Sequence, residues 1–190
     1  MYLCIFSKEE KMKEKDYFKQ FDICFGNLSF GKHSLSVEVK DTFFEKFEIE
    51  DVTGADVQVL IELERKETLV ILHFEMQGDL YSICDLCLEK ISIPVADSRN
   101  LILKFVSEPC QSDDEDIVFI KENTYSYNVE QVIFEYIYAL MPMRKVHGET
   151  GSGTCNQEML SLIENATQKP TEREDARWEA LKYIDLEEDK

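Results

Sequence analysis

The sequence has 190 residues, 44% of them hydrophobic and 11% aromatic, which fits one folded domain with appendages rather than a disordered chain. The 39 Asp and Glu residues outnumber the 21 Lys and Arg residues, so the formal net charge is -18 and the surface repels phosphate. This balance disfavours broad contact with RNA or DNA and favours basic protein partners. The alternative is that the acidic excess only keeps the protein soluble.

Export and membrane insertion are not expected. The apolar run 2–6 is shorter than a signal-peptide core and has no basic region before it. No stretch approaches the roughly 20 apolar residues that cross a bilayer. The six cysteines are too few for a disulfide-rich secreted scaffold. We therefore expect a cytoplasmic protein without membrane contact, whose thiols are reduced or bound to metal.

The first two thirds of the chain predict an α+β fold built on an antiparallel β-sheet. Apolar residues alternate over 57–63, with Leu60 breaking the alternation, and over 70–76, which predicts a hairpin of two strands. Gly78-Asp79 is expected to end the second strand. Further strands are expected at 34–39, 91–95, 101–106 and 117–120. Such a sheet of five or six strands could curl into a partial barrel that protects its edges.

One strong helix and two short C-terminal helices are also predicted. The strong helix begins at Asn128, which can form a capping box with Gln131, and Pro142 ends it. Shorter helices are expected at 156–163 and, after Lys169-Pro170, in the tail. Near the start of the sheet, Asp41 is expected to cap a brief helix. One apolar face of the strong helix is expected to be buried, formed by Val129, Val132, Ile133, Tyr136, Ile137 and Leu140.

The chain divides into three predicted parts. Residues 1–17 form an N-terminal extension, 18–166 a single domain, and 167–190 an acidic amphipathic helical tail. The tail holds Trp178, the only Trp of the chain, on an apolar stripe too short for an independently stable helix. We therefore expect Trp178 to pack either on the parent domain or in a partner's groove.

Two charged segments are candidate partner-binding sites. An acidic run in a loop could attract a basic partner or a divalent ion, or could be only solvated: Asp113, Asp114, Glu115 and Asp116. Beyond the strong helix, Arg144 and Lys145 form a small basic spot. This spot could contact RNA at one place, or it could be a solvated helix end.

The chemistry of the chain is concentrated in cysteines. Cys84 and Cys87 form a C-x-x-C motif between two predicted strands, where a tight turn can direct both sulfurs at one metal ion. His147 and Cys155 lie far along the chain, around a Gly-rich connection. The four residues offer a Cys3His donor set, which suits a closed, structural, tetrahedral Zn²⁺ site. The alternative is a set of reduced thiols and a surface histidine.

Catalysis has less support in the sequence. A thiol-disulfide enzyme using Cys84 and Cys87 is the weaker reading, because such dithiols stand at a helix N-terminus, whereas Cys87 leads into a predicted strand. In the candidate metal site, Cys110 could replace one of the four predicted ligands. The chain has no P-loop, no G-x-G-x-x-G and no H-E-x-x-H motif, so we expect neither an enzyme nor a small-molecule substrate.

These motifs together resemble the YceD family, the large ribosomal RNA subunit accumulation proteins. The resemblance rests on the stretch 84–89, the acidic loop, the capped helix running into 140–144, and then His147 and Cys155. It spans about 18–163, and residues 175–181 are similar to the Asp-Pro-Arg-Trp element that ends some members. Leu86 stands where many members carry Arg or Lys.

The resemblance implies a role in accumulation or maturation of large-subunit ribosomal RNA, metal binding, and no catalytic activity. A strongly acidic protein is expected to serve RNA indirectly, by binding a basic ribosomal protein or a large-subunit assembly intermediate. Direct RNA contact through the basic spot, and a zinc-braced interaction module unrelated to ribosomes, are the alternatives.

Overall fold

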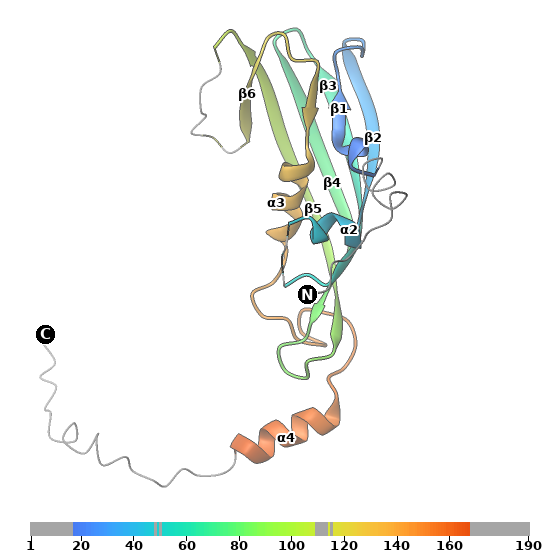
Figure 1. Cartoon of the computed structure of the whole chain (residues 1–190), viewed down its shortest axis with the longest axis vertical. Helices are drawn as coiled ribbons and strands as arrows, with labels where there is room; N and C mark the ends of the chain where they lie inside the picture. The colour runs from blue at the N-terminus through green and yellow to red at the C-terminus, as the bar shows by residue number, and fades with distance from the viewer. Residues whose placement is uncertain (1–16, 48, 50, 109–113, 115, 168–190) are drawn as a thin grey trace, which may run out of the picture.

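The computed structural model describes residues 17–47, 49, 51–108, 114 and 116–167, which form an α+β structure with two sheets (Figure 1). The larger sheet has five strands in the order β2-β3-β4-β5-β6, and β1 pairs with β7. Neighbouring strands are antiparallel except β5 and β6, which are parallel. The strands are β1 (Asp22–Cys24), β2 (Gly31–Lys40), β3 (Gly54–Arg65), β4 (Leu69–Ile83), β5 (Lys90–Val106), β6 (Ile117–Lys121) and β7 (Ser126–Asn128).

The described residues contain three α-helices: α2 (Asp41–Glu45), α3 (Glu130–Tyr138) and α4 (Gln157–Thr167). A 3₁₀ turn, η1 (Lys19–Phe21), precedes β1. These helices confirm the three predicted near Asp41, after Asn128 and at 156–163. The predicted tail helix lies outside the described residues. The division into extension, domain and tail stays a prediction, since nearly all of 1–17 and of 167–190 lies outside them too.

The predicted helix caps are only partly right. Asn128 Oδ1 accepts the amide of Glu130 at 2.9 Å, but Gln131 does not complete a capping box and bonds Glu135 one turn on. Asp41 is not a cap either. It lies inside α2, and its Oδ1 accepts the amide of Ala55 at 2.8 Å, which ties α2 to the start of β3.

The two central strands are longer than the sequence predicts. β4 does not end at Gly78-Asp79 but continues to Ile83, still paired with β5. A Cβ atom at Gly78 would lie 2.1 Å from the carbonyl oxygen of Asp56, so this glycine lets β3 and β4 approach closely. The predicted strands 91–95 and 101–106 are one strand, because the polar segment between them also pairs with β4.

Leu60 does not break the alternation of β3. Val57, Val59, Ile61 and Leu63 are buried, and the residues between them, Leu60 included, face outward. Leu60 is 40% exposed, so it is an apolar residue on the solvent side of a regular strand. The sheet therefore has one buried and one open face.

The predicted closure into a partial barrel is wrong, because the sheet is open with β2 and β6 at its edges. The parallel β6 also makes the sheet mixed rather than wholly antiparallel. Part of the β2 edge is covered by side chains. Tyr17 Oη donates to the Glu38 carbonyl and accepts the Lys40 amide, both at 2.9 Å, and Gln20 bonds the backbone of Glu38. Such bonds satisfy edge groups that would otherwise attract another strand.

The core lies between the buried sheet face and the segments that cover it. Helix α3 buries Ile133 and Ile137, and its Phe134 stacks on Phe47 with ring centroids 3.9 Å apart. Phe74 of β4 meets Tyr136 edge to face at 5.7 Å. Aromatic contacts thus join α3 both to the sheet and to the segment after α2, and the predicted apolar face of α3 does pack inward.

Candidate metal centre

Cys84 and Cys87 lie in the turn that joins β4 to β5. The Cys84 amide donates to the Glu89 carbonyl at 2.8 Å, and the Leu88 amide donates to the Cys84 carbonyl at 3.0 Å. Leu88 has a φ of 60°, the left-handed conformation that closes the turn. Both cysteines are buried, with 0% and 3% of their surfaces exposed. The predicted C-x-x-C turn is therefore confirmed.

The segment after α3 is fastened to this turn. The Asp85 amide donates to the Lys145 carbonyl at 2.7 Å, and the Lys145 amide donates to Asp85 Oδ2 at 2.6 Å. Further along, the Ser152 amide donates to the Ser92 carbonyl at 2.8 Å. A Cβ atom at Gly151 would lie 2.4 Å from Ile91 Cγ1, so only glycine lets this loop lie so close to β5. These contacts hold His147 and Cys155 beside the turn.

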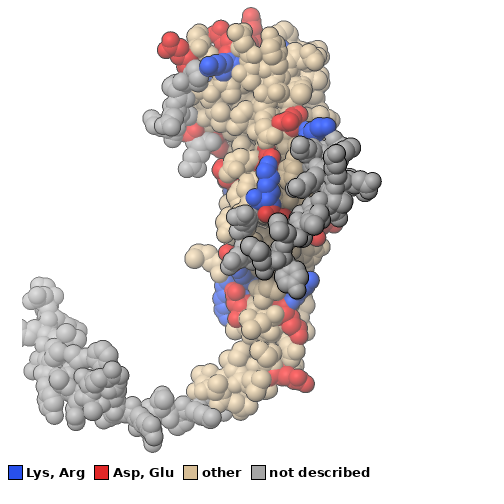
Figure 2. Space-filling view, in the orientation of Figure 1, with Lys and Arg blue, Asp and Glu red and all other residues tan. Residues whose placement is uncertain are grey.

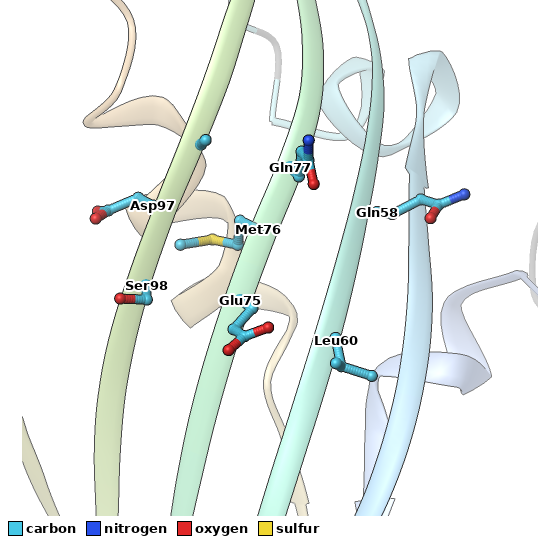
Figure 3. A pocket seen from close by; sticks show the side chains of 8 residues that line it. Gln58, Leu60, Glu75, Met76, Gln77, Asp97 and Ser98 are labelled. Atoms are coloured by element: carbon cyan, nitrogen blue, oxygen red, sulfur yellow. The ribbon is translucent and has the colours of Figure 1, made fainter.

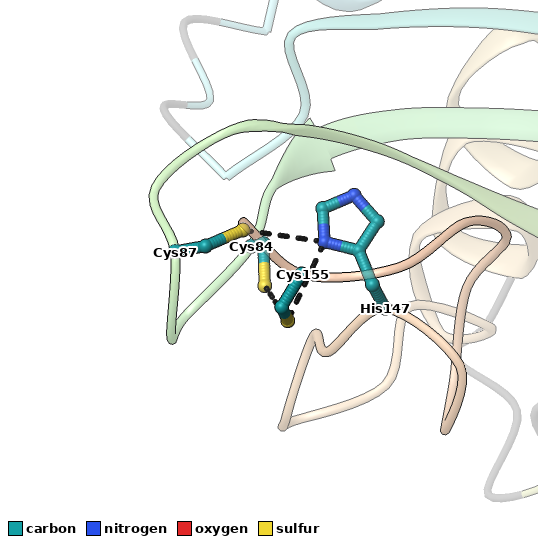
Figure 4. Close-up of side chains that lie close together, drawn as sticks. All are labelled: Cys84, Cys87, His147 and Cys155. Carbon is teal, nitrogen blue, oxygen red and sulfur yellow. Dashed lines mark hydrogen bonds between the residues drawn. The ribbon is translucent and has the colours of Figure 1, made fainter. Parts of the chain in front are cut away.

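The structure brings Cys84, Cys87, His147 and Cys155 together (Figure 4). One side-chain atom of each residue lies within 4.8 Å of the others, which makes them a group that could hold a metal ion. Cys84 Sγ is 3.8 Å from Cys155 Sγ. His147 Nδ1 is 3.4 Å from Cys87 Sγ and 3.8 Å from Cys155 Sγ. The four residues form the Cys/His cluster.

A backbone contact orients the imidazole of His147. Its Nε2 atom lies 3.1 Å from the carbonyl oxygen of Lys90. Because a carbonyl only accepts, Nε2 carries the proton, and in the neutral ring Nδ1 keeps a lone pair that faces the sulfurs. Histidine ligands of metals are commonly oriented by such a contact on the other ring nitrogen. The Lys90 contact has no sequence signal, since any residue supplies a carbonyl.

The thiols differ in acidity. Burial raises the pKa of the Cys84 thiol, but the backbone amides of Cys87, His147 and Leu86 outweigh burial and lower this pKa to about 6. Burial, hydrogen bonds to Cys84 and Cys87, and their charge raise the pKa of the Cys155 thiol to about 11. The cluster thus stabilises one thiolate and opposes another. A cation between the sulfurs would remove that opposition.

Both residues of the predicted basic spot form ion pairs. Arg144 forms an ion pair with Glu149 at 3.3 Å, and Lys145 forms one with Asp51 at 3.1 Å. The Lys145 side chain is only 13% exposed. Lys145 therefore helps to fasten the segment before the cluster, and its backbone contact with Asp85 adds to this role. Asp85 therefore helps to position the segment that carries His147. The sequence did not indicate this role, because Asp is common in turns.

Of the other predicted site residues, only Asp114 and Asp116 are described, and they lie just before β6. The Asp114 side chain accepts the Asp116 amide at 3.1 Å, and the Asp114 carbonyl accepts the Ile117 amide at 3.2 Å, so these residues shape the turn before β6. Asp113, Glu115, Trp178 and Cys110 lie outside the described residues. The exposed Cys24 lies in β1 and does not belong to the cluster.

A second candidate site is an open hollow of about 570 Å³ on the outward face of the sheet (Figure 3). Its lining offers amide, hydroxyl and carboxylate groups and includes neither Cys nor His. One of its two carboxylates, Asp97, is already paired with Arg99 at 2.7 Å. The hollow is lined by Gln58, Leu60, Glu75, Met76, Gln77, Ala96, Asp97 and Ser98. The Cys/His cluster is therefore the stronger candidate for chemistry.

The fold and the cluster define an α+β protein with a candidate metal centre at one end of its sheet. The chain belongs to the YceD family, because the family model "Large ribosomal RNA subunit accumulation protein YceD" matches residues 72–184. This span includes all four residues of the cluster and confirms the predicted family. Membership supports a role in accumulation of large-subunit ribosomal RNA. No curated protein and no solved structure matches the chain. Within the described ranges, no helix is long and apolar enough to cross a membrane.

The left-handed residue of the turn provides a first prediction. Leu88 is 65% exposed, so its side chain gains little from packing while its backbone conformation is unfavourable for an L-residue. We expect Leu88→Gly to raise the free energy of unfolding by about 1 kcal/mol in urea titrations. Leu35→Gly, at an exposed position of β2, is the control and is expected to lower it. A loss of stability in the Leu88 variant would contradict the inference that the backbone of Leu88 is strained.

Proposed function

We propose that the protein is a non-catalytic cytoplasmic accessory factor that supports accumulation of large-subunit ribosomal RNA, and that its Cys/His cluster binds a structural Zn²⁺ ion. Family membership carries the first part of this proposal. The donor set carries the second, because three thiolates and one imidazole are a usual ligand set of closed zinc sites, which leave no position open for a substrate.

The spacing of the donor atoms supports zinc. With bond lengths of about 2.3 Å to sulfur and about 2.0 Å to nitrogen, a tetrahedral site separates two sulfurs by about 3.8 Å and sulfur from nitrogen by about 3.5 Å. The cluster has 3.8 Å between two sulfurs and 3.4 and 3.8 Å between His147 Nδ1 and two sulfurs. When bound, the ion would link the β4–β5 turn to the segment after α3.

The charge of the chain supports a basic protein as the direct partner. A net charge of -18 attracts basic proteins and repels ribosomal RNA. The ion pairs of Arg144 and Lys145 place a carboxylate beside each cation of the predicted RNA contact, which weakens its attraction for phosphate. Ribosomal proteins carry positive patches because they bind a polyanion. The protein would thus bind a large-subunit ribosomal protein or an assembly intermediate that exposes one.

Removal of the protein from its cells tests this function. We expect depletion to lower the ratio of large-subunit to small-subunit ribosomal RNA, and precursors of the large subunit to carry the tagged protein in sucrose gradients. Re-expression of the wild-type chain should restore the ratio. An unchanged ratio together with no co-sedimentation would refute the ribosomal role. Tight binding to naked ribosomal RNA with a steep salt dependence would instead refute the protein-partner mechanism.

A further inference from the structure

Helix α4 begins directly beside the Cys/His cluster and is fastened there. Asn156 follows the cluster residue Cys155, and its side-chain amide donates to Glu89 Oε1 of the β4–β5 turn at 2.8 Å. Asn156 Oδ1 also accepts the amide of Glu158 at 2.9 Å, which caps the first turn of α4. The start of the helix is therefore held at the cluster, while its remainder projects from that end of the molecule (Figure 1).

The apolar face of α4 is left largely uncovered by the described residues. The helix has no buried residue, and Leu162 and Ile163 are 62% and 40% exposed. Met159, Leu162, Ile163 and Ala166 recur at three- and four-residue steps and share one face, of which only Met159 packs partly on the core. In the view of Figure 2, most of the visible surface of α4 carries no charged side chain. An eleven-residue helix with such a face is marginal alone in water.

The charge on α4 indicates what covers this face. The helix contains Glu158 and Glu164 and neither Lys nor Arg, and the turn that holds its start adds Asp85 and Glu89. RNA and anionic lipid would be repelled by these carboxylates. A second copy of the chain would bring its own acidic helix and a further net charge of -18. A basic protein surface is complementary to α4 in both charge and polarity.

We propose that α4 is the docking helix of this protein, and that its apolar face enters an apolar groove rimmed by Lys and Arg on a large-subunit ribosomal protein. This inference rests on the proposed function and identifies the contact surface. The carboxylates on the polar side of α4 pair with the basic rim, while Leu162 and Ile163 fill the groove. The Cys/His cluster and the Asn156–Glu89 contact position the helix relative to the sheet.

Substitutions on opposite faces of α4 test the inference. The full-length protein is titrated with individually purified, RNA-free large-subunit ribosomal proteins, and binding is followed by fluorescence anisotropy at one salt concentration. We expect Leu162→Asp with Ile163→Asp to weaken binding at least about tenfold. Ser161→Asp with Asn165→Asp makes the same charge change on the polar face and should alter binding by no more than about twofold. Circular dichroism checks that both variants keep the folded body.

Each other outcome overturns the inference in a distinct way. Equal weakening by both variants would show that bulk charge, and not the apolar face, controls binding. Wild-type binding that survives the apolar-face substitutions would place the contact elsewhere and leave the proposed function intact. Self-association, or binding to naked ribosomal RNA, that is lost on the same substitutions would identify a different occupant. Binding to none of the ribosomal proteins would also refute docking, while the depletion experiment judges the proposed function separately.

Discussion

Replacement of Cys87 by Ser is expected to abolish binding of the proposed Zn²⁺ ion and to lower the free energy of unfolding by at least about 3 kcal/mol. Cys87 is 3% exposed, and its sulfur lies 3.4 Å from His147 Nδ1. A thiol from solution therefore could not reach the cluster to replace this ligand. Structural zinc contributes roughly 10–16 kcal/mol in small domains that depend on it for folding. A smaller loss is expected here, because most of the buried hydrophobic core comes from the sheet and the helices that cover it rather than from the cluster.

The Cys87 prediction is checked by metal analysis and urea unfolding on the same preparation. We expect one Zn²⁺ per wild-type chain and none on the Cys87→Ser variant, with a chelator lowering wild-type stability to that of the variant. Cys24→Ser is the matched control, because Cys24 is exposed in β1 and lies outside the cluster. A wild-type protein that is purified without chelator, carries no metal and equals the variant in stability would contradict the site.

The second large effect is expected in the sheet, where two leucines of β3 face opposite sides. Leu63 is fully buried and pairs with Leu72 of β4, so Leu63→Ala should lower the free energy of unfolding by about 2–5 kcal/mol. Leu60 is 40% exposed on the open face, and Leu60→Ala should cost less than about 1 kcal/mol. Urea titration of both variants measures the difference. Equal losses would mean that the strand does not alternate as described.

Cys155 connects the proposed metal site with the proposed docking helix. This residue is a member of the cluster, and the next residue, Asn156, begins the fastening of α4. Binding of Zn²⁺ would therefore fix the helix that is proposed to dock with a ribosomal protein. The cluster lies at the end of the long β4–β5 hairpin, away from α2 and α3, so a bound ion would brace this end of the sheet (Figure 1).

Local patterns in the sequence were sufficient for most of the secondary structure. The three-to-four-residue recurrence of apolar side chains predicts α3 and α4, and alternation predicts the paired halves of β3 and β4. Each period is set by the backbone geometry of one element, so a single segment reveals it. The failures at Gly78 and Leu60 have a common cause, because the effect of each residue depends on the neighbouring strand or on the face that the strand buries.

The sequence by itself determined the acidic charge, the Cys3His donor set and the family likeness, because these depend only on which residues are present and in what order. Only the tertiary structure decided that the sheet stays open, that β6 joins it in parallel, and that Asp85 and the Lys90 carbonyl position the cluster. It also decided that Arg144 and Lys145 form ion pairs and that the described residues leave the apolar face of α4 largely uncovered. The physical reason is that such contacts join residues far apart along the chain, and no local pattern records which distant segment will lie alongside.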